Sequence, residues 1–421
     1  MRFTFVHAAD LHLDTPFEGL GRVNPQLGER LRDASLDAFD DLVELTIDRR
    51  ADFLVIAGDV YDGADRGVRA QLRFLRGLKR LAFAGVRVFV VHGNHDPLDG
   101  WSAIRAWPPN VTLFGAADVE AHAVERQGER LATIYGISYP RRDVTENLAL
   151  RFRRGSEPGF HVGLLHCAVG AVGDHARYSP CTVDDLRAAG MDYWALGHVH
   201  DRRVLAERDP WVVYPGNLQG RSIKPTEQGA KGATVVHVVD GVVDRLEFVP
   251  CDRARFAEVE VDLAGVRTLP DVTASCLDAL TQLRAAHPTG DLIARVRLVG
   301  RTAARADLRR SPDTPERLLQ ALRDELERGP APLWCESVRD ETRAELDVDA
   351  IRGRGDFAAA VVQRADALAA DEARRAEFLD AHLDGPSASA VAPAPDFAAQ
   401  QRLLDSALEL ALDLLERREP A

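Results

Sequence analysis

Cysteines are few in this sequence, and long apolar runs are missing. The five cysteines are odd in number, lie far apart and form no C-x-x-C pair, which argues against a disulfide framework and against a zinc finger. No apolar run approaches the length of a membrane span, and no signal peptide precedes the first strand-like segment. We therefore expect a reduced, cytoplasmic compartment and no membrane partner.

Lysine is almost absent, and the chain is acidic. Only Lys79, Lys224 and Lys231 are lysines, so nearly all positive charge is arginine, which suits bidentate phosphate contacts. The formal net charge of −13 argues against nucleic-acid binding by bulk charge, although it leaves room for a local basic track. Residues 346–421 hold 8 Arg against 15 Asp and Glu, a balance of −7. We expect this tail to dock on a protein rather than on DNA.

The chain is long enough for more than one domain. At 421 residues with 46% hydrophobic content, two or three domains are expected. Residues 1–250 alternate strand-like and helix-like segments, which predicts an α/β domain. A small α/β cap domain is predicted at 251–347. A helical partner-docking region is predicted at 348–421, with a linker rich in Gly, Pro, Ser and Ala at 385–395.

Local periodicity predicts individual elements. Helical spacing of apolar residues predicts helices at 25–49, 68–84, 272–286 and 396–418, the last with an Asp396 cap. Strand patterns recur at 256–261 and 292–298. The late strands 212–214 and 234–239 are expected to form a second sheet, and Asp240-Gly241 signals a hairpin.

Five polar clusters each follow an apolar, strand-like run. They are Asp10-Leu11-His12, Gly58 to Asp62, Gly93 to Asp96, His166, and Gly197 to His200. Ligands of α/β sheets gather outside the carboxyl ends of strands, so the clusters should converge on one site. On an extended segment, Asp10 and His12 would point to the same side. Oxygen and imidazole donors of this kind suit Mn²⁺, Fe or Zn²⁺.

These segments resemble the calcineurin-like metallophosphoesterases. The stretches from Ala8 to Phe17, from Tyr193 to His200 and from Tyr214 to Arg221 resemble the YhaO-type branch of the SbcD DNA repair exonuclease family. The resemblance covers residues 1 to about 250. It implies a four-layer αββα sandwich, in which two packed sheets are flanked by helices. The expected fold class is therefore α/β, with the sandwich followed by the α/β cap domain and C-terminal helices.

The resemblance also implies roles for single residues. Two divalent metal ions are expected, with Mn²⁺ favoured and Fe or Zn²⁺ as alternatives. The first ion would take Asp10, His12, Asp59 and His200, and the second would take Asp59, Asn94, His166 and His198. The catalytic pair would be His95, which assists the transition state without binding metal, and Asp96, which orients it. The implied reaction is phosphodiester hydrolysis by attack of a metal-bound hydroxide.

Some residues keep two interpretations. Asp62 either caps its turn or contacts substrate, and archaeal and eukaryotic nuclease relatives carry a histidine at its position. Arg221 and Lys224 follow the Pro215-Gly216-Asn217 turn, and they either grip a DNA phosphate or are ordinary surface charges.

The leading functional hypothesis is a Mn²⁺-dependent DNA exonuclease or endonuclease subunit in DNA repair. By resemblance, its partners would be DNA and an SbcC-like or YhaN-like coiled-coil ATPase, with a homodimer as a further option. One alternative is a phosphodiesterase on nucleotides or other small diesters. Another is an interaction subunit of the ATPase with little activity alone. The long region after residue 250 favours the nuclease, because a small-substrate enzyme needs no such extension.

Overall fold

The computed structural model describes residues 1–15, 25–63, 67–100, 102–170, 178–326, 333–383 and 397–416. The chain divides into two units. The first unit comprises Met1–Val259, Leu280–Arg295 and Arg323–Ser337, and the second unit comprises Glu260–Ala279, Val296–Leu322 and Val338–Ala421. The predicted domain boundaries after residues 250 and 347 stay predictions. Residues 16 and 17, the linker at 385–395 and the Asp396 cap lie outside the described residues.

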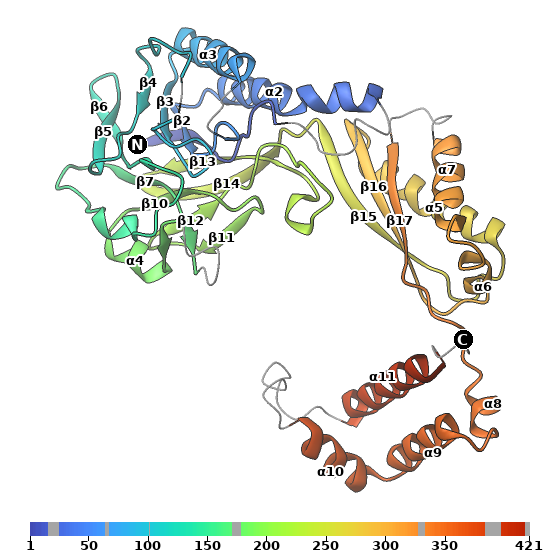
Figure 1. The fold of residues 1–421 in the computed structure, drawn as a ribbon. Coiled ribbons are helices and arrows are strands. Elements are labelled where there is room, and N and C mark those ends of the chain that lie inside the picture. Colours follow the sequence, from blue (N-terminus) through green and yellow to red (C-terminus); the bar gives the residue numbers. More distant parts are fainter. Residues whose placement is uncertain are drawn as a thin grey trace. The chain divides into compact units, whose positions relative to one another are not determined.

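Two six-stranded sheets form the body of the first unit (Figure 1). The first sheet has the order β14 (Val242–Pro250), β13 (Gly232–Val239), β1 (Arg2–Ala8), β2 (Phe53–Ala57), β3 (Arg87–Val91) and β4 (Val111–Leu113). The second has the order β11 (Arg203–Ala206), β12 (Trp211–Tyr214), β10 (Tyr193–Gly197), β7 (Phe160–His166), β6 (Glu129–Gly136) and β5 (Glu120–Arg126). Strands β1 to β4 run parallel, as do β6, β7, β10 and β12.

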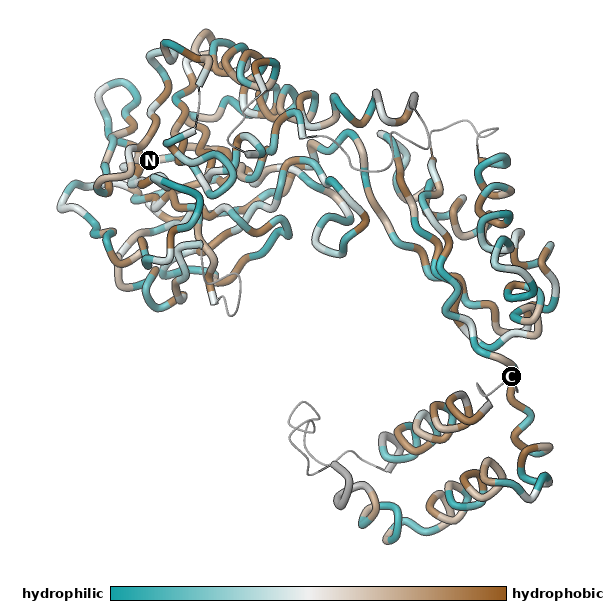
Figure 2. The backbone as a smooth tube through the Cα atoms, viewed as in Figure 1, coloured by the Kyte–Doolittle hydropathy of each residue, from teal (hydrophilic) through white to brown (hydrophobic). Residues whose placement is uncertain are grey.

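Alternate side chains of each inner strand enter different cores. In β1, Phe5 lies between the sheets, where it stacks on Phe53 at a ring-centroid distance of 4.7 Å and meets Tyr193 edge-on at 5.3 Å. Its neighbour Val6 belongs to the cluster on the other face of the first sheet. This alternation follows from the two-residue period of a strand. Figure 2 shows hydrophobic residues recurring along the strands and helices of the first unit.

Helices cover the outer face of each sheet. Helices α2 (Pro25–Asp48) and α3 (Val68–Phe83) supply Leu42 and Leu78 to the outer cluster of the first sheet. Helix α4 (Val183–Ala188) and the 3₁₀ helix η1 (Leu148–Arg151) supply apolar residues to the outer cluster of the second sheet. The layers are therefore helix, sheet, sheet and helix, and the predicted αββα sandwich is confirmed.

One strand lies in a different sheet from the one that the sequence predicts. Strand β12 lies in the second sheet, but β13 pairs antiparallel with β1 in the first. The expectation that both belong to a second sheet is therefore wrong for β13. The reason is that Val235 and Val236 bury opposite faces of β13 in two different cores, and an apolar run does not say which neighbour it pairs with. The predicted hairpin is present, with positive φ of 50° and 79° at Asp240 and Gly241.

The region after the sandwich contains the predicted strands and helices. A three-stranded sheet has the order β15 (Ala254–Asp262), β16 (Asp291–Val299) and β17 (Leu333–Asp340). Its connections contain α5 (Leu269–Ala286), α6 (Arg305–Leu308) and α7 (Thr314–Leu326). The remaining helices are α8 (Val348–Arg352), α9 (Phe357–Ala370), α10 (Glu372–Leu383) and α11 (Phe397–Glu416).

The last helices of the second unit have a small core of their own. Ile351, Ala358, Val362 and Leu412 are buried together. The carboxylate of Asp356 caps α9 by accepting from the backbone N–H of Ala359 at 2.9 Å. Within the described part of the chain, no helix combines the length and the apolar character needed to cross a membrane.

The aromatic cluster between the sheets gives a direct test of the fold. Phe5→Ala should lower the free energy of unfolding by about 3–5 kcal/mol, because a fully buried ring is lost and a cavity remains. Urea unfolding followed by tryptophan fluorescence measures this change. Phe83→Ala is the matched control, since Phe83 is 98% exposed, and its effect should stay within about 0.5 kcal/mol. Equal effects of the two variants would contradict the assigned core.

Candidate metal centre

Polar residues collect where five parallel strands end in the first unit. Three of these strands, β1, β2 and β3, are neighbours in the first sheet, and β7 and β10 are neighbours in the second. The residues at or just past their ends are Asp10 and His12 after β1, Asp59 and Asp62 after β2, Asn94 and His95 after β3, His166 as the last residue of β7, and His198 and His200 after β10. The predicted convergence at strand ends is therefore present in the structure.

The loop after β1 is not extended. Asp10 and His12 have positive φ of 52° and 42°, and Asp59 after β2 has 52°. The expectation of an extended Asp10-x-His12 segment is thus wrong. Instead, the backbone N–H groups of Asp10 and His12 donate to the carbonyls of Gly58 and Asp59, at 3.1 and 3.0 Å, and tie the two loops together. A left-handed conformation costs a non-glycine residue roughly 1–3 kcal/mol, and such costs cluster at functional sites.

The carboxylate of Asp59 lies at the middle of the cluster. It is buried, and its Oδ1 accepts from the backbone N–H of His95 at 2.9 Å. Its Oδ2 lies 3.5 Å from His166 Nε2 and 3.9 Å from His12 Nε2. Burial, and then the nearby Asp59 charge, raises the pKa of Asp10 well above its ordinary value. A positive charge beside Asp10 would stabilise its anion, and a bound cation supplies one.

Two histidines, His166 and His200, each have a hydrogen-bond partner at ring nitrogen Nδ1. His166 Nδ1 lies 2.9 Å from the carbonyl oxygen of Ala57, and His200 Nδ1 lies 2.6 Å from Glu227 Oε1. An acceptor at Nδ1 places a proton there, which leaves Nε2 as the ring atom that would bind a metal. These partners therefore fix the orientation of both rings, with Nε2 directed into the site.

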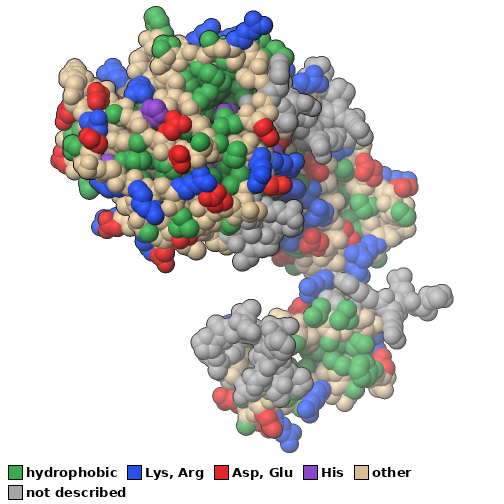
Figure 3. Space-filling view, turned by 60° about the vertical axis from the view of Figure 1, so that its left-hand side comes forward, with side chains coloured by type: hydrophobic (Ala, Val, Ile, Leu, Met, Phe, Trp, Pro, Cys, Tyr) green, Lys and Arg blue, Asp and Glu red, His purple; other side chains and the backbone are tan. Residues whose placement is uncertain are grey.

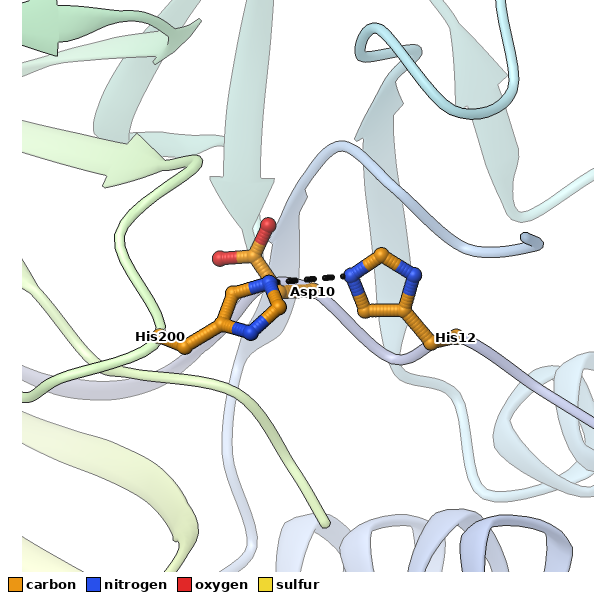
Figure 4. A group of neighbouring side chains, drawn as sticks. All are labelled: Asp10, His12 and His200. Carbon is orange, nitrogen blue, oxygen red and sulfur yellow. Dashed lines mark hydrogen bonds between the residues drawn. The ribbon is translucent and has the colours of Figure 1, made fainter. Parts of the chain in front are cut away.

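The inward-facing ring nitrogens lie close to other candidate ligand atoms. His166 Nε2 lies 2.9 Å from Asn94 Oδ1, and His200 Nε2 lies 3.1 Å from His12 Nε2 (Figure 4). Burial, and then the charge of Arg221, lowers the pKa of His12 well below its ordinary value, which favours a neutral ring. The buried His12 Nδ1 has no hydrogen-bond partner among the described residues. Ions bound among these atoms would take Nε2 of His12, His166 and His200 and the amide oxygen of Asn94 as ligands, so the arrangement fits bound metal.

Seven side chains together could hold two ions. Ligand atoms of Asp10, His12 and His200 lie within 4.8 Å of one another, and so do those of Asp10, Asp59 and His166. Asn94 and His198 join the second group, because Asn94 Oδ1 lies 3.2 Å from His198 Nδ1 as well as close to His166. Carboxylate, imidazole and amide donors in this mixture suit Mn²⁺, Fe or Zn²⁺.

Two glycines make this close packing feasible. A Cβ on Gly197 would overlap the carbonyl oxygen of Ala57, the same atom that contacts His166. A Cβ on Gly93 would overlap Asp59 Oδ1 and approach the His166 ring at 2.8 Å. Any side chain at either position would therefore displace the metal-ligating candidates.

His95 takes its carboxylate contact from Asp62. Its Nδ1 lies 2.5 Å from Asp62 Oδ1, and the other oxygen of Asp62 accepts from Arg221 Nη1 at 2.8 Å. Burial alone would lower the pKa of His95, but the Asp62 hydrogen bond and the charges of Asp59 and Asp62 raise it. The His95 hydrogen bond is in turn the main cause that lowers the pKa of Asp62 to about 2.

Asp96 has a different position from the one expected. Its carboxylate accepts from the backbone N–H groups of Asp59, Val60 and Gly93, at 3.2, 2.9 and 2.8 Å, and it contacts the His92 ring at 3.2 Å. The expected orientation of His95 by Asp96 is therefore corrected, because Asp62 makes that contact. Asp96 instead joins the loops that follow β2 and β3.

Of the two predicted cations, one contacts the site and the other does not. Arg221 contacts the site through Asp62, whereas Lys224 is exposed and its side chain makes no contact with the site among the described residues.

Glu227, at the end of the 3₁₀ helix η3 (Pro225–Glu227), is a residue of the site that the sequence did not predict. Burial would raise the pKa of Glu227, but the hydrogen bond and charge of His200 lower it to about 2. No local motif marks Glu227, because its partner His200 lies 27 residues away.

Known families match two parts of the chain. The family described as calcineurin-like phosphoesterase matches residues 3–202, which include all seven candidate ligands. The family described as metallophosphoesterase YhaO, middle domain, matches residues 256–343. The second match covers all but the first two residues of β15, and it includes β16 and β17.

Individual known proteins are also similar to this chain. The chain is 37% identical over 347 residues to an uncharacterized metallophosphoesterase YhaO from Bacillus subtilis (strain 168), covering 82% of this chain and 83% of that protein. It is 30% identical to the DNA double-strand break repair protein Mre11 of Sulfurisphaera tokodaii, over 55% of this chain and 58% of that one. It is 31% identical to the SbcD component of the nuclease SbcCD from Bacillus subtilis (strain 168), over 56% of this chain and 66% of that one.

The predicted family is thereby confirmed. A phosphoesterase match over the sandwich, a YhaO match over the region that follows it, and a relative covered along most of its length agree with the five strand-end clusters. The chain belongs to the calcineurin-like metallophosphoesterases of the YhaO type, homologous to the SbcD and Mre11 proteins, and it is a hydrolase of phosphoesters.

Proposed function

We propose that this chain is a two-metal phosphodiesterase that cleaves DNA. The first ion would be held by Asp10, His12, Asp59 and His200, and the second by Asp59, Asn94, His166 and His198. The observation that carries the proposal is the buried Asp59 carboxylate, whose Oδ2 lies 3.5 Å from His166 Nε2 and 3.9 Å from His12 Nε2, one histidine from each group of candidate ligands. Two divalent ions bound there would neutralise phosphate charge and activate water for hydrolysis.

His95 is the proposed proton donor to the leaving oxygen. Its backbone N–H is fixed on Asp59 Oδ1, and its ring Nδ1 is held by Asp62, which leaves Nε2 available for proton transfer. The His95 side chain is 31% exposed, whereas His12 and His166 are buried. The exposed edge is where a polymeric substrate can reach it.

DNA is the proposed substrate because the similarity includes an Mre11 protein and a component of the SbcCD nuclease. Bulk charge does not attract DNA to a chain with a net charge of −13. On the face shown in Figure 3, Lys and Arg side chains are mixed with acidic ones. Binding would therefore depend on the ions and on fixed cations such as Arg221, whose guanidinium is held at the site by Asp62.

The C-terminal helices are the proposed docking site for a coiled-coil ATPase of the SbcC or YhaN kind. An apolar groove of about 340 Å³ lies between α9 and α11. Phe357, which lines the groove, is 71% exposed, and Leu410 and Leu414 of α11 are 54% and 57% exposed. Apolar grooves of this kind take the apolar face of a partner helix. The groove supports a protein partner for this region, in line with its acidic composition.

The nuclease proposal is tested with Mn²⁺-dependent degradation of linear and circular DNA. The purified chain should degrade linear DNA when Mn²⁺ is present and stop when the metal is chelated. Asp59→Asn should bind fewer Mn²⁺ ions and show no degradation, because one carboxylate serves both ions. Asp244→Asn, an exposed carboxylate of β14, is the control and should behave as wild type.

Two results would change this proposal. Asp59→Asn with two bound Mn²⁺ ions and full activity would contradict the shared ligand. A wild-type chain that leaves DNA intact but hydrolyses a small aryl phosphodiester would favour the small-diester alternative, or an enzyme that needs its ATPase.

His95→Ala separates catalysis from metal binding. The variant should keep both Mn²⁺ ions and lose about 10²- to 10⁴-fold in kcat, the usual contribution of general acid catalysis. Calorimetric Mn²⁺ titration and hydrolysis of an aryl phosphodiester measure the two effects. His122→Ala is the control, since His122 is half-buried on β5, where it pairs with Glu120 and packs edge-on against Phe114 rather than against the site. Loss of a Mn²⁺ ion in His95→Ala would show that His95 is a ligand instead.

A further inference from the structure

We propose that Glu227 is a positioning residue that holds the His200 imidazole and the turn carrying Arg221 in one arrangement. Its carboxylate would thereby connect the metal-binding half of the site to the half that contains His95. The inference rests on the proposed two-metal function and adds a determinant of metal affinity and of substrate binding from outside the ligand set.

The two oxygens of Glu227 serve different halves of the site. Oε1 accepts from His200 Nδ1 at 2.6 Å. Oε2 accepts from the side-chain amide of Asn217 at 2.8 Å and from the backbone N–H of Arg221 at 3.0 Å. The residue is 6% exposed, so water competes little for these contacts. One buried carboxylate thus receives three donors from two chain segments, His200 after β10 and the turn at 217–221.

On the metal side, the contact sets the ring of His200. A carboxylate at Nδ1 keeps the proton on that atom and aims the lone pair of Nε2 at the position between His200 and His12. Outer partners of metal-binding histidines contribute about 10- to 100-fold to metal affinity. The backbone of His200 is held separately, because Lys231 Nζ donates to its carbonyl at 2.8 Å. Loss of Glu227 should therefore disturb the ring more than the chain.

On the substrate side, the contact sets Arg221. With its N–H fixed by Glu227, Arg221 extends its guanidinium to Asp62 Oδ2 at 2.8 Å, and Asp62 Oδ1 holds His95. The Nε of Arg221 is buried without a hydrogen-bond partner among the described residues. Substrate cannot reach that buried Nε, but the Arg221 side chain is 22% exposed, and the guanidinium has further N–H donors beside the carboxylates of the site. A phosphate oxygen of the substrate is an acceptor of the right kind for these donors.

Glu227→Gln is the sharpest variant. The amide keeps the size of the side chain but offers only one acceptor oxygen to the three donors. At least one of the contacts with His200, Asn217 and Arg221 is therefore lost. Calorimetric Mn²⁺ titration of the full chain should show the weaker of the two sites at a Kd raised about 10- to 100-fold. At saturating Mn²⁺, kcat on an aryl phosphodiester should recover, while KM stays raised because Arg221 is no longer held.

Two further variants separate the two halves. Arg221→Ala should raise KM without changing Mn²⁺ affinity, since it leaves the contact between Glu227 and His200 intact. Glu207→Gln, on an exposed turn, should change neither quantity. A folded Glu227→Gln chain with wild-type Mn²⁺ affinity and wild-type KM would overturn the inference and leave the two-metal proposal standing. A wild-type chain that binds no Mn²⁺ would overturn both.

A measurement on the wild-type chain decides the case in which Glu227→Gln does not fold. Nitrogen-15 NMR of the histidine rings in the metal-free chain should show His200 with its proton on Nδ1. A proton on Nε2 would mean that Glu227 does not set the tautomer, and would overturn the inference.

Discussion

The structure depends on a cluster of buried metal-ligating candidates around Asp59. A buried acceptor that has no partner among the described residues, such as His12 Nδ1, costs about 1–3 kcal/mol, and each left-handed residue such as Asp10 or His12 adds roughly 1–3 kcal/mol. A domain has only about 5–15 kcal/mol of net stability, so several such terms form a large share of it. A metal ion present at a concentration about 100 times its Kd stabilises the folded state by about 2.7 kcal/mol. Metal binding is therefore on the scale needed to offset the cost of building the site.

The surrounding architecture holds this cluster with backbone groups. Asp96 accepts three backbone N–H groups from two loops, and Asp10 accepts the N–H of His198 from the other sheet at 3.1 and 3.0 Å. The carbonyl of Ala57 in the first sheet orients His166 in the second. Because these contacts join the sheets at one edge, the packing of Phe5 against Phe53 and Tyr193 also fixes the separation of the ligands.

Carboxylates in one small volume perform different tasks because their neighbours differ. Asp59 faces imidazole nitrogens, Asp62 pairs with a histidine and an arginine, and Asp96 is surrounded by backbone N–H groups. The sequence shows the type and order of these residues but not their neighbours. Strand ends and ligand types could be predicted, since both follow from local apolar runs and donor chemistry. The partner of His95, the left-handed loop after β1 and the contact of Glu227 with His200 could not, because each depends on segments distant in the sequence.

The charge of the site makes phosphate binding conditional on metal. Asp10, Asp59, Asp62 and Glu227 place four carboxylates close together, and Arg221 is the guanidinium held among them. Without ions, this group repels a polyanion such as DNA, and the net charge of −13 adds to the repulsion. Two divalent ions would add four positive charges at the point where the scissile phosphate must lie. In this acidic chain, the same ions that support catalysis would therefore also create the attraction that brings the substrate to the site.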